Sequence, residues 1–169
     1  MSAPRTPLLT VDTVIEMVDR PGRPIVLIER KYPPYGWALP GGFVDIGEQL
    51  ERAAVREARE ETALQVQLMA LLGCYSDPRR DARGHTVSAV YVATATGEPQ
   101  ARDDARDLMI CDPADCPELA FDHATIVADY LRYRDSGQVA PRGSCVGEHG
   151  IARGGELLRV SVAFRQEAT

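Results

Sequence analysis

The sequence predicts one layered domain of the α/β or α+β class, and three observations lead to this prediction. Its 169 residues, 44% of them apolar and 26% charged, suffice to build the core of a single domain. Short runs rich in β-branched residues recur along the chain and are typical of strands. Two longer runs without Gly or Pro are typical of helices. Strands mixed with helices form a sheet that the helices cover.

The strands are predicted from β-branched and apolar runs, of which residues 86–95 form the clearest. The runs are residues 8–18, 24–29, 65–75 with an interruption or bulge at Gly73, 86–95 and, within the acidic irregular stretch 97–117, residues 108–111. Turns and loops separate them, at Pro21-Gly22, over a stretch rich in Pro, Tyr and Gly at 31–36, and over a polar stretch at 76–84.

The helices are predicted over residues 49–62 and 121–134. The first is rich in Ala, Arg and Glu, which are good helix formers. The second places its apolar side chains near one face, namely Ile126, Val127, Tyr130 and Leu131. We therefore expect two helices, far apart in the chain, among the strands.

Beyond residue 134 the chain changes character. Residues 135–155 are rich in Gly and poor in apolar residues, which favours a loop or a partly disordered linker. Residues 157–164 are typical of one more strand, which joins either the domain's own sheet or the edge of a partner's sheet. We therefore expect a domain over residues 1–134, a C-terminal extension over residues 135–169, and a homodimer.

Composition narrows the classes of function. A formal net charge of −6 argues against binding to nucleic acid or an anionic membrane, but it allows a small phosphorylated substrate that binds with a divalent cation. The chain has no apolar run of about 18 residues, and its N-terminal residues lack the apolar centre of a signal peptide. Four cysteines without a C-x-x-C pair give a zinc site little support, so we expect reduced thiols in a cytoplasmic protein.

Three glutamates define the first candidate site. Glu57, Glu60 and Glu61 stand at i, i+3 and i+4 on the first predicted helix, which places them on one face. Like charges at this spacing repel by roughly 0.2–0.5 kcal/mol per exposed pair, and a divalent cation bound between them would offset that repulsion. The helix alone is nevertheless more typical of a solvated acidic face than of a metal site.

The segment before this helix favours the metal site. Gly41 and Gly42 precede Glu48 and the helix, and a Gly pair taken alone is more typical of a plain turn. Its bare backbone also allows the carbonyl oxygen of Gly42 to serve as one more hard ligand beside the carboxylates. A Gly turn followed by a carboxylate helix therefore predicts a compact site for Mg²⁺, or for Mn²⁺ in its place.

Residues 42–64 resemble the box that defines the Nudix hydrolase family. The positions that fit the family's spacing are Gly42, Glu48, Arg56, Glu57, Glu60, Glu61 and Leu64, with Ala58 as a small occupant of an aliphatic position. One position departs, because Ala63 stands where the family has Gly. Gly there eases the helix exit through a left-handed conformation, in which Ala costs about 1–2 kcal/mol. The departure concerns the helix exit and leaves the ligand positions unchanged.

The resemblance implies an α/β/α sandwich around a mixed sheet over roughly residues 8–134, and attack of water on a diphosphate linkage of a nucleoside diphosphate derivative. The implied roles are metal binding by Gly42, Glu57, Glu60 and Glu61, orientation of Glu60 by Arg56, and support of the site by Glu48. The general base in this family is a glutamate of the box or an acidic residue on a later loop. Here that loop offers Glu98, Asp103, Asp104 and Asp107, which otherwise form a solvated acidic loop.

A second stretch, residues 75–86, guides the choice of substrate. It resembles a segment of the ADP-ribose pyrophosphatase-like members of the family, and residues 119–123 resemble the start of the last helix in that group. Arg79, Arg80 and Arg83 would bind a diphosphate in forked geometry, unless they form a solvated basic loop that neighbouring aspartates balance.

Three more side chains are candidates for substrate binding. His85 is either a base that faces the ligand or, more typically, a structural histidine at the start of a strand. Trp37 and Tyr35 would stack on an adenine, unless Trp37 packs in the core. We expect hydrolysis of ADP-ribose to AMP and ribose 5-phosphate. The alternatives are a nucleoside triphosphate pyrophosphohydrolase and a catalytically silent nucleotide-sensing domain, which usually adds a DNA-binding region.

Overall fold

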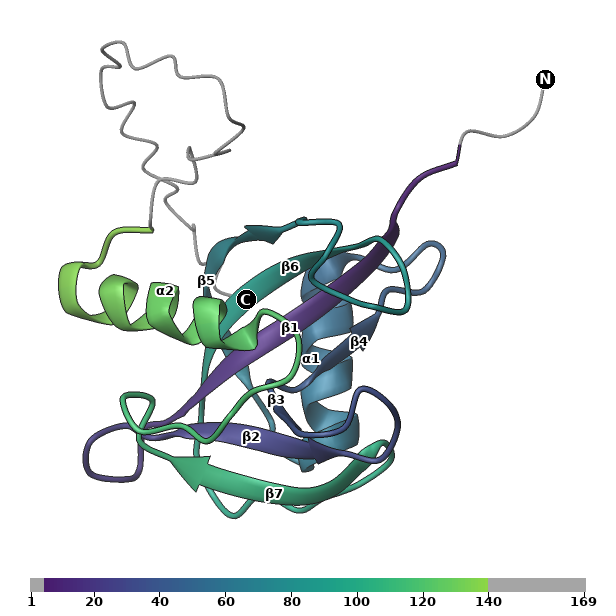
Figure 1. The fold of residues 1–169 in the computed structure, drawn as a ribbon. Coiled ribbons are helices and arrows are strands. Elements are labelled where there is room, and N and C mark those ends of the chain that lie inside the picture. The colour runs from purple at the N-terminus through teal and green to yellow at the C-terminus, as the bar shows by residue number, and fades with distance from the viewer. Residues whose placement is uncertain (1–4, 140–169) are drawn as a thin grey trace, which may run out of the picture.

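One mixed sheet forms the centre of the computed structural model, which describes residues 5–139 (Figure 1). Within these residues seven strands form a single sheet with the order β3-β2-β1-β6-β5, and β4 and β7 join it by pairing with β1 and β2. The strands are β1 (Leu8–Met17), β2 (Ile25–Arg30), β3 (Trp37–Ala38), β4 (Gly41–Phe43), β5 (Gln67–Tyr75), β6 (Thr86–Ala95) and β7 (Ala105–Cys111). The helices are α1 (Leu50–Thr62) and α2 (His123–Ser136).

Strand β1 organises the sheet. It pairs in parallel with β6 from Leu8↔Thr86 to Met17↔Ala95, which covers its whole length. On its other edge it pairs antiparallel with β4 near its start and with β2 near its end. The parallel pair among antiparallel ones makes the sheet mixed, as the family resemblance implies.

The two helices cover opposite faces of the sheet, with α2 in front and α1 behind in the view of Figure 1. Alternate residues of β1 serve the two layers, because successive side chains of a strand point to opposite faces. Val14 packs with Ile126 and Tyr130 under α2, whereas Ile15 packs with Ala58 of α1. The α/β/α sandwich is therefore confirmed.

The Gly pair differs from the sequence prediction. Gly41 and Gly42 lie in β4 and pair with Asp12 and Val11 of β1, so they do not form a plain turn. A Cβ atom on Gly41 would lie 2.2 Å from the carbonyl oxygen of Val11. The missing side chain lets the two strands approach each other, and sequence patterns do not reveal such a long-range pairing.

Other boundaries differ in smaller ways. Strand β7 begins at Ala105, three residues before the predicted start, because its exposed outer half carries polar side chains such as Asp107. The register of β5 shifts between Leu71 and Gly73, which confirms the predicted bulge. Ala63 keeps the left-handed conformation that the family's Gly would take, with φ of 60°.

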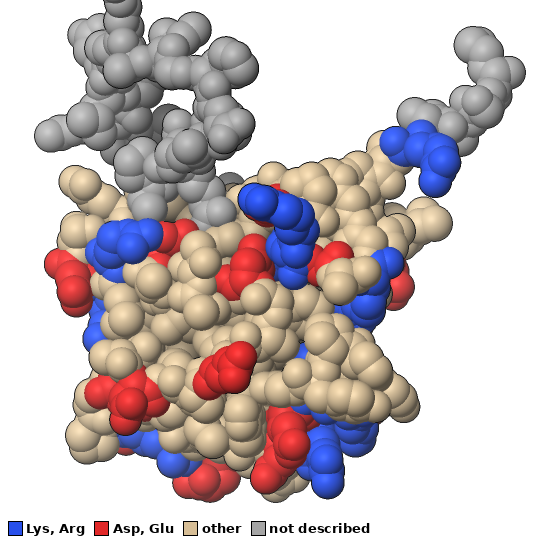
Figure 2. Space-filling model, in the orientation of Figure 1, with Lys and Arg blue, Asp and Glu red and all other residues tan. Residues whose placement is uncertain are grey.

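The surface and the thiols complete the description. No helix within residues 5–139 is long and apolar enough to cross a membrane. Figure 2 shows acidic and basic side chains interspersed over the face that α2 covers. Cys74 lies on β5, as predicted, while the Sγ atoms of Cys111 and Cys116 are 3.4 Å apart as free thiols. The strand predicted at 157–164 lies outside the described residues.

Candidate metal and diphosphate site

Helix α1 presents two of its glutamates at the margin of its packing face. Ala53, Ala54 and Ala58 are fully buried against the sheet, because their small side chains let the helix approach closely. Glu57 and Glu61 share this side of the helix, and their side chains are only 14% and 4% exposed. The carboxylates therefore line a pocket between α1, β4 and the loop at 103–104.

Burial makes the ionised form of these two carboxylates unfavourable. It raises the pKa of Glu61 to about 8, although a hydrogen bond from the Gly41 backbone N–H to Oε2 at 2.9 Å opposes this shift. Burial also raises the pKa of Glu57. Buried acids this close together need a cation to carry negative charge at low cost, which is the electrostatic setting of a metal site.

Gly42 makes room for one of these acids. A Cβ atom at this position would lie 2.5 Å from Oε1 of Glu57. Only glycine leaves that space free, so the backbone of β4 lies directly against the carboxylate. The donors gathered here are hard oxygens, the type that Mg²⁺ and Mn²⁺ bind.

The carboxylates form an open cluster. Within residues 5–139, no group of three acidic, histidine or cysteine side chains is placed so that it could hold a metal ion by itself. Glu60 is 38% exposed at the outer side of the pocket. An open arrangement fits Mg²⁺, which commonly combines one or two carboxylates with water and substrate phosphates.

Arg56 donates hydrogen bonds to three acidic side chains and fixes their positions. Its Nε and Nη2 atoms donate to the two carboxylate oxygens of Glu48 at 2.9 and 2.8 Å. Its Nη1 atom donates to Glu57 at 2.7 Å and to Glu60 at 3.1 Å. These hydrogen bonds hold the pKa of Glu48 near 2 and raise that of Arg56. Arg56 therefore contacts Glu60, as expected, and also Glu57.

The later acidic loop separates into two groups. Asp104 lines the carboxylate pocket and also a second, adjoining pocket, and its carbonyl oxygen accepts from the Lys31 N–H at 3.1 Å. Asp103 lines the carboxylate pocket. Glu98 lies outside both pockets, because its 85% exposed side chain pairs with Arg20 at 2.8 Å. Asp107 lies on β7, opposite Glu29.

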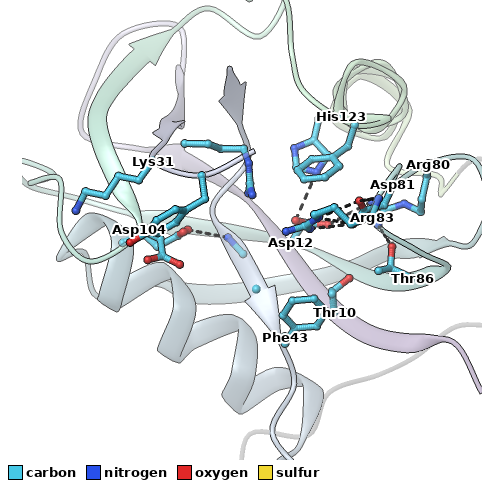
Figure 3. Close-up of a pocket in the computed structure, with 16 residues that line it drawn as sticks. Thr10, Asp12, Lys31, Phe43, Arg80, Asp81, Arg83, Thr86, Asp104 and His123 are labelled. Carbon is cyan, nitrogen blue, oxygen red and sulfur yellow. Dashed lines mark hydrogen bonds and ion pairs between the residues drawn. The ribbon is translucent and has the colours of Figure 1, made fainter. Parts of the chain in front are cut away.

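The adjoining pocket, which we call the cation-rich pocket, is lined by four basic side chains and also by the carboxylates of Asp12, Glu61, Asp81 and Asp104 (Figure 3). It shares Gly41, Gly42, Phe43, Glu61 and Asp104 with the carboxylate pocket. Its other walls come from the end of β2, the loop at 76–85 and the start of α2, and carry Arg30, Lys31, Arg80 and Arg83. A negatively charged group bound here would lie next to the acidic cluster of α1.

The three predicted arginines occupy different environments. Arg79 lies outside both pockets, and its 90% exposed side chain pairs with Asp77. Arg80 is buried and donates to both carboxylate oxygens of Asp122, at 3.0 and 2.8 Å. Arg83 lines the cation-rich pocket and pairs with Asp81 at 2.8 Å. Arg79 therefore has the environment of a solvated basic loop in which an aspartate balances the charge, and it does not face a diphosphate.

Arg30 is a cation that sequence reasoning missed. Its Nε atom donates to the carbonyl oxygen of Pro34 at 2.7 Å, and no ion pair involves it within residues 5–139. Its guanidinium carbon and that of Arg83 lie 4.8 and 5.3 Å from the centre of the Phe121 ring. Burial, with the charge of Arg83, lowers the pKa of Arg30. Its position at the end of a buried strand was the available signal.

The aromatic candidates also change. Trp37 packs against the core under α2, and His85 is exposed, with its Nε2 atom 3.2 Å from the Ser76 carbonyl oxygen. Neither lines the cation-rich pocket, nor does the exposed Tyr35. The aromatic side chains that do line it are Tyr32, Phe43 and Phe121.

Comparison with known proteins adds independent findings. Residues 8–130 match the family model described as "NUDIX domain". The chain is 45% identical over 132 residues to an ADP-ribose pyrophosphatase of Methanocaldococcus jannaschii, covering 76% of each chain. It is 33% identical over 126 residues to the ADPR responsive transcriptional repressor NtrR of Acinetobacter baylyi, covering 70% of this chain and 50% of the repressor.

A solved structure gives the same match at the level of the fold. It is a bifunctional NMN adenylyltransferase/ADP ribose pyrophosphatase from Francisella tularensis, complexed with AMP and a Mn ion, and it superposes with a TM-score of 0.66 at 27% identity. The match covers 78% of this chain and 43% of that protein. The chain thus spans about half or less of the repressor and of the bifunctional enzyme, but three quarters of the archaeal relative.

Proposed function

Because this chain belongs to the NUDIX family, we propose that it is a divalent-metal-dependent hydrolase that cleaves ADP-ribose to AMP and ribose 5-phosphate. One observation supports this function most directly: the carboxylate pocket beside α1 and the cation-rich pocket share a wall. A diphosphate needs both a metal that bridges its oxygens to carboxylates and side chains that bind its outer charges. The 45% identity to the archaeal ADP-ribose pyrophosphatase supports the choice of substrate.

Glu57, Glu60 and Glu61, with the backbone of Gly42, would hold Mg²⁺ or Mn²⁺. The buried carboxylates that lie against a bare glycine backbone support this assignment. When bound, the metal would neutralise the diphosphate oxygens and lower the pKa of a coordinated water. Arg56 would keep the carboxylates in place through its forked contacts with Glu48, Glu57 and Glu60.

Asp104 is the acid that we propose as general base on the later loop. It lines both pockets, so a water that attacks phosphorus from the acidic side would lie within its reach. Glu57 and Glu60 remain alternatives, as the resemblance implies. Glu98 does not fit this role, because its carboxylate pairs with Arg20 and lies outside both pockets.

The substrate would bind across the cation-rich pocket. Arg30 and Arg83 would bind the diphosphate or a ribose oxygen, and their shared contact with Phe121 supports a common target. Phe43, which is 47% exposed beside the acidic pocket, offers a surface for stacking a base. These residues replace Arg79, His85 and Trp37 in the proposed substrate site.

A panel of nucleotides tests the proposed function. Wild-type protein with Mg²⁺ is assayed on ADP-ribose and on nucleoside triphosphates, beside Glu61→Gln and Glu51→Gln. Glu51 is the matched control, because it lies on the same helix but outside both pockets, where it accepts from Tyr91 Oη at 3.1 Å. We expect ADP-ribose to be preferred, Glu61→Gln to lose activity and Glu51→Gln to keep it. Preference for a triphosphate would contradict the substrate, and full activity of Glu61→Gln would contradict the metal site.

The repressor of Acinetobacter baylyi favours a second candidate, a domain that binds ADP-ribose without cleaving it. Calorimetry with ADP-ribose and Mg²⁺ separates the two. Tight binding without any product over hours would support the sensor, whereas turnover supports the hydrolase.

We also propose that the protein is a cytoplasmic homodimer. The strand predicted at 157–164 supports a dimer contact, and the prediction of reduced thiols supports the location. Light scattering on the full chain tests the oligomeric state, and a monomer at micromolar concentration would contradict it.

A further inference from the structure

Asp12 is a buried carboxylate in the middle of β1, at the inner wall of the cation-rich pocket (Figure 3). It is 8% exposed and faces the α2 side of the sheet, where His123 and Arg80 lie. Burying a carboxylate is costly unless several donors satisfy it. The identity of its donors therefore indicates what this residue does.

One hydrogen-bond donor and two longer charged contacts reach Asp12 from three separate elements. Ser88 Oγ on β6 donates to Oδ2 of Asp12 at 2.5 Å. His123 Nε2, at the first residue of α2, lies 3.5 Å from Oδ1. Arg80 Nη2, from the loop at 76–85, lies 3.6 Å from Oδ2. Asp12 thereby ties two walls of the cation-rich pocket to the central strands of the sheet.

His123 links Asp12 to the chain segment just before β4, the strand that lines the carboxylate pocket. The backbone N–H of Leu39 donates to Nδ1 of His123 at 2.9 Å, so Nδ1 carries no proton. The proton of the neutral ring therefore sits on Nε2 and faces Asp12. Full burial of the imidazole lowers its pKa, in the direction that an unprotonated Nδ1 requires. Leu39 is two residues before Gly41, the start of β4.

Asp12 also contacts β4 through the sheet. It pairs with Gly41, where a Cβ atom would lie 2.7 Å from Oδ1 of Asp12. The N–H of Gly41 in turn donates to Glu61 Oε2. Arg80 also donates a hydrogen bond to Asp122, which directly precedes α2. The loop at 76–85, which carries Arg80, carries Arg83 as well.

We propose that Asp12 is a positioning residue that fixes the cation-rich pocket against the metal-binding carboxylates. It holds the loop at 76–85 and the start of α2 in register with β4 and Glu61, so that a diphosphate bound by the arginines lies over the metal. This inference rests on the proposed function. A displacement of about 1 Å between a bound group and its catalyst can cost on the order of a hundredfold in rate, so this alignment has functional weight.

The same strand supplies a matched control. Glu16 lies four residues further along β1 on the same face, is 3% exposed, and bonds to Tyr130 of α2 and to Arg23. It is a buried carboxylate tied to the same helix, yet it lines neither pocket. Glu16→Gln therefore reports the cost of a defect in β1 without a defect in the site.

The experiment compares Asp12→Asn, Glu16→Gln and Ser88→Ala on ADP-ribose with Mg²⁺. In Asp12→Asn the amide oxygen can replace Oδ2 beside Ser88 and Arg80, but the amide NH2 then replaces Oδ1 and faces the proton on His123 Nε2, and the negative charge beside Arg80 is lost. We therefore expect a fall in kcat of ~10–100-fold, as is usual for supporting partners of a metal site. We expect KM for ADP-ribose to stay close to the wild-type value. The affinity for Mn²⁺, measured without substrate, should also stay close to the wild-type value. Ser88→Ala should lower kcat to an intermediate value. Glu16→Gln should lower the melting temperature but keep kcat.

Each outcome decides the proposal. Unchanged kcat in folded Asp12→Asn, or a loss that Glu16→Gln shares, would overturn it. A loss confined to KM would mean that Asp12 contacts substrate, and a loss of Mn²⁺ affinity would make it a ligand. If Asp12→Asn does not fold, Ser88→Ala decides in its place, since full kcat there contradicts the proposal.

A spectroscopic measurement tests the same network without mutation. The chain has 3 histidines, so the imidazole ¹⁵N spectrum is simple to assign. We expect His123 to be neutral with its proton on Nε2, and a proton on Nδ1 would contradict the arrangement. Absence of ADP-ribose turnover by wild type would refute the proposed function, whereas turnover with unaffected Asp12→Asn would refute only this inference.

Discussion

Ala63 ends α1 in the left-handed region, with φ of 60° and ψ of 6°. Its backbone N–H closes the helix by donating to the Arg59 carbonyl at 2.9 Å. A Cβ atom clashes with the following carbonyl in this conformation, which costs roughly 1–2 kcal/mol, while Gly carries a larger entropy cost of about 0.4–1 kcal/mol. The strain at Ala63 therefore leaves stability to be gained at the helix end.

We expect Ala63→Gly to raise the free energy of unfolding by about 0.5–1 kcal/mol, which is the difference between these two effects. Urea unfolding measures the change. Ala58→Gly is the control, because Ala58 has a helical conformation and is buried, so Gly there should destabilise by about 1 kcal/mol or more. A loss of stability in Ala63→Gly would show that the left-handed exit is not strained.

For single residues, the sequence predicted the acidic cluster better than the substrate site. The spacing of Glu57, Glu60 and Glu61 depends only on the helical period, and their common side follows from it. Arg79 and Arg80 are neighbours of the same type, and only the fold buries one of them beside Asp122. Arg30 becomes a candidate only because β2 ends at the pocket.

Strand β4 is the element on which both pockets depend. Its two glycines have different roles, because backbone atoms limit the space beside Gly41 and side-chain atoms limit the space beside Gly42. A Cβ atom on Gly41 meets the backbone of Val11, whereas a Cβ atom on Gly42 meets the end of the Glu57 side chain. Backbone cannot yield cheaply, but a side chain can rotate away.

This difference predicts distinct defects for two similar substitutions. Gly42→Ala should fold with near-wild-type stability but bind Mn²⁺ more weakly and lose activity, because Glu57 is pushed from its place. Gly41→Ala should lose stability, because β4 separates from β1. Thermal unfolding and Mn²⁺ titration measure both effects. Equal Mn²⁺ affinity of Gly42→Ala and wild type would contradict the assignment of Glu57.

The elements themselves could be predicted where the pattern is local. The period of β6 and the composition of α1 lead directly to their bounds. Short pairings such as β4 with β1 join residues about thirty positions apart and leave no periodic signal. The exposed polar half of β7 likewise lacks the alternation that marks a strand.

The whole molecule combines a stable sandwich with a site that carries excess negative charge. Glu61 and Asp12 are buried and Glu57 is partly buried near them, and the repulsion between these carboxylates weakens the folded state until a cation binds. The pattern of strands and helices predicted a layered domain, and the family resemblance implied the three layers and the mixed sheet. The meeting of two pockets at β4 depends on the sheet order, which no local pattern in the sequence encodes.

Metal binding should therefore stabilise the fold. A ligand at a hundred times its Kd adds about 2.7 kcal/mol, so saturating Mg²⁺ or Mn²⁺ should raise the melting temperature of the wild type by several degrees. Chelation with EDTA should reverse the rise. Glu61→Gln should show little or no rise, while Glu51→Gln behaves like the wild type. A similar rise in Glu61→Gln would place the metal elsewhere.

The reaction products show whether the protein hydrolyses the diphosphate of ADP-ribose and whether it needs a metal to do so. ³¹P NMR follows ADP-ribose incubated with the wild-type protein and Mg²⁺, with EDTA in a parallel sample. We expect equal amounts of AMP and ribose 5-phosphate from the Mg²⁺ sample and intact ADP-ribose in the presence of EDTA. ADP-ribose that stays intact with Mg²⁺, or products that form equally well in EDTA, would contradict this expectation.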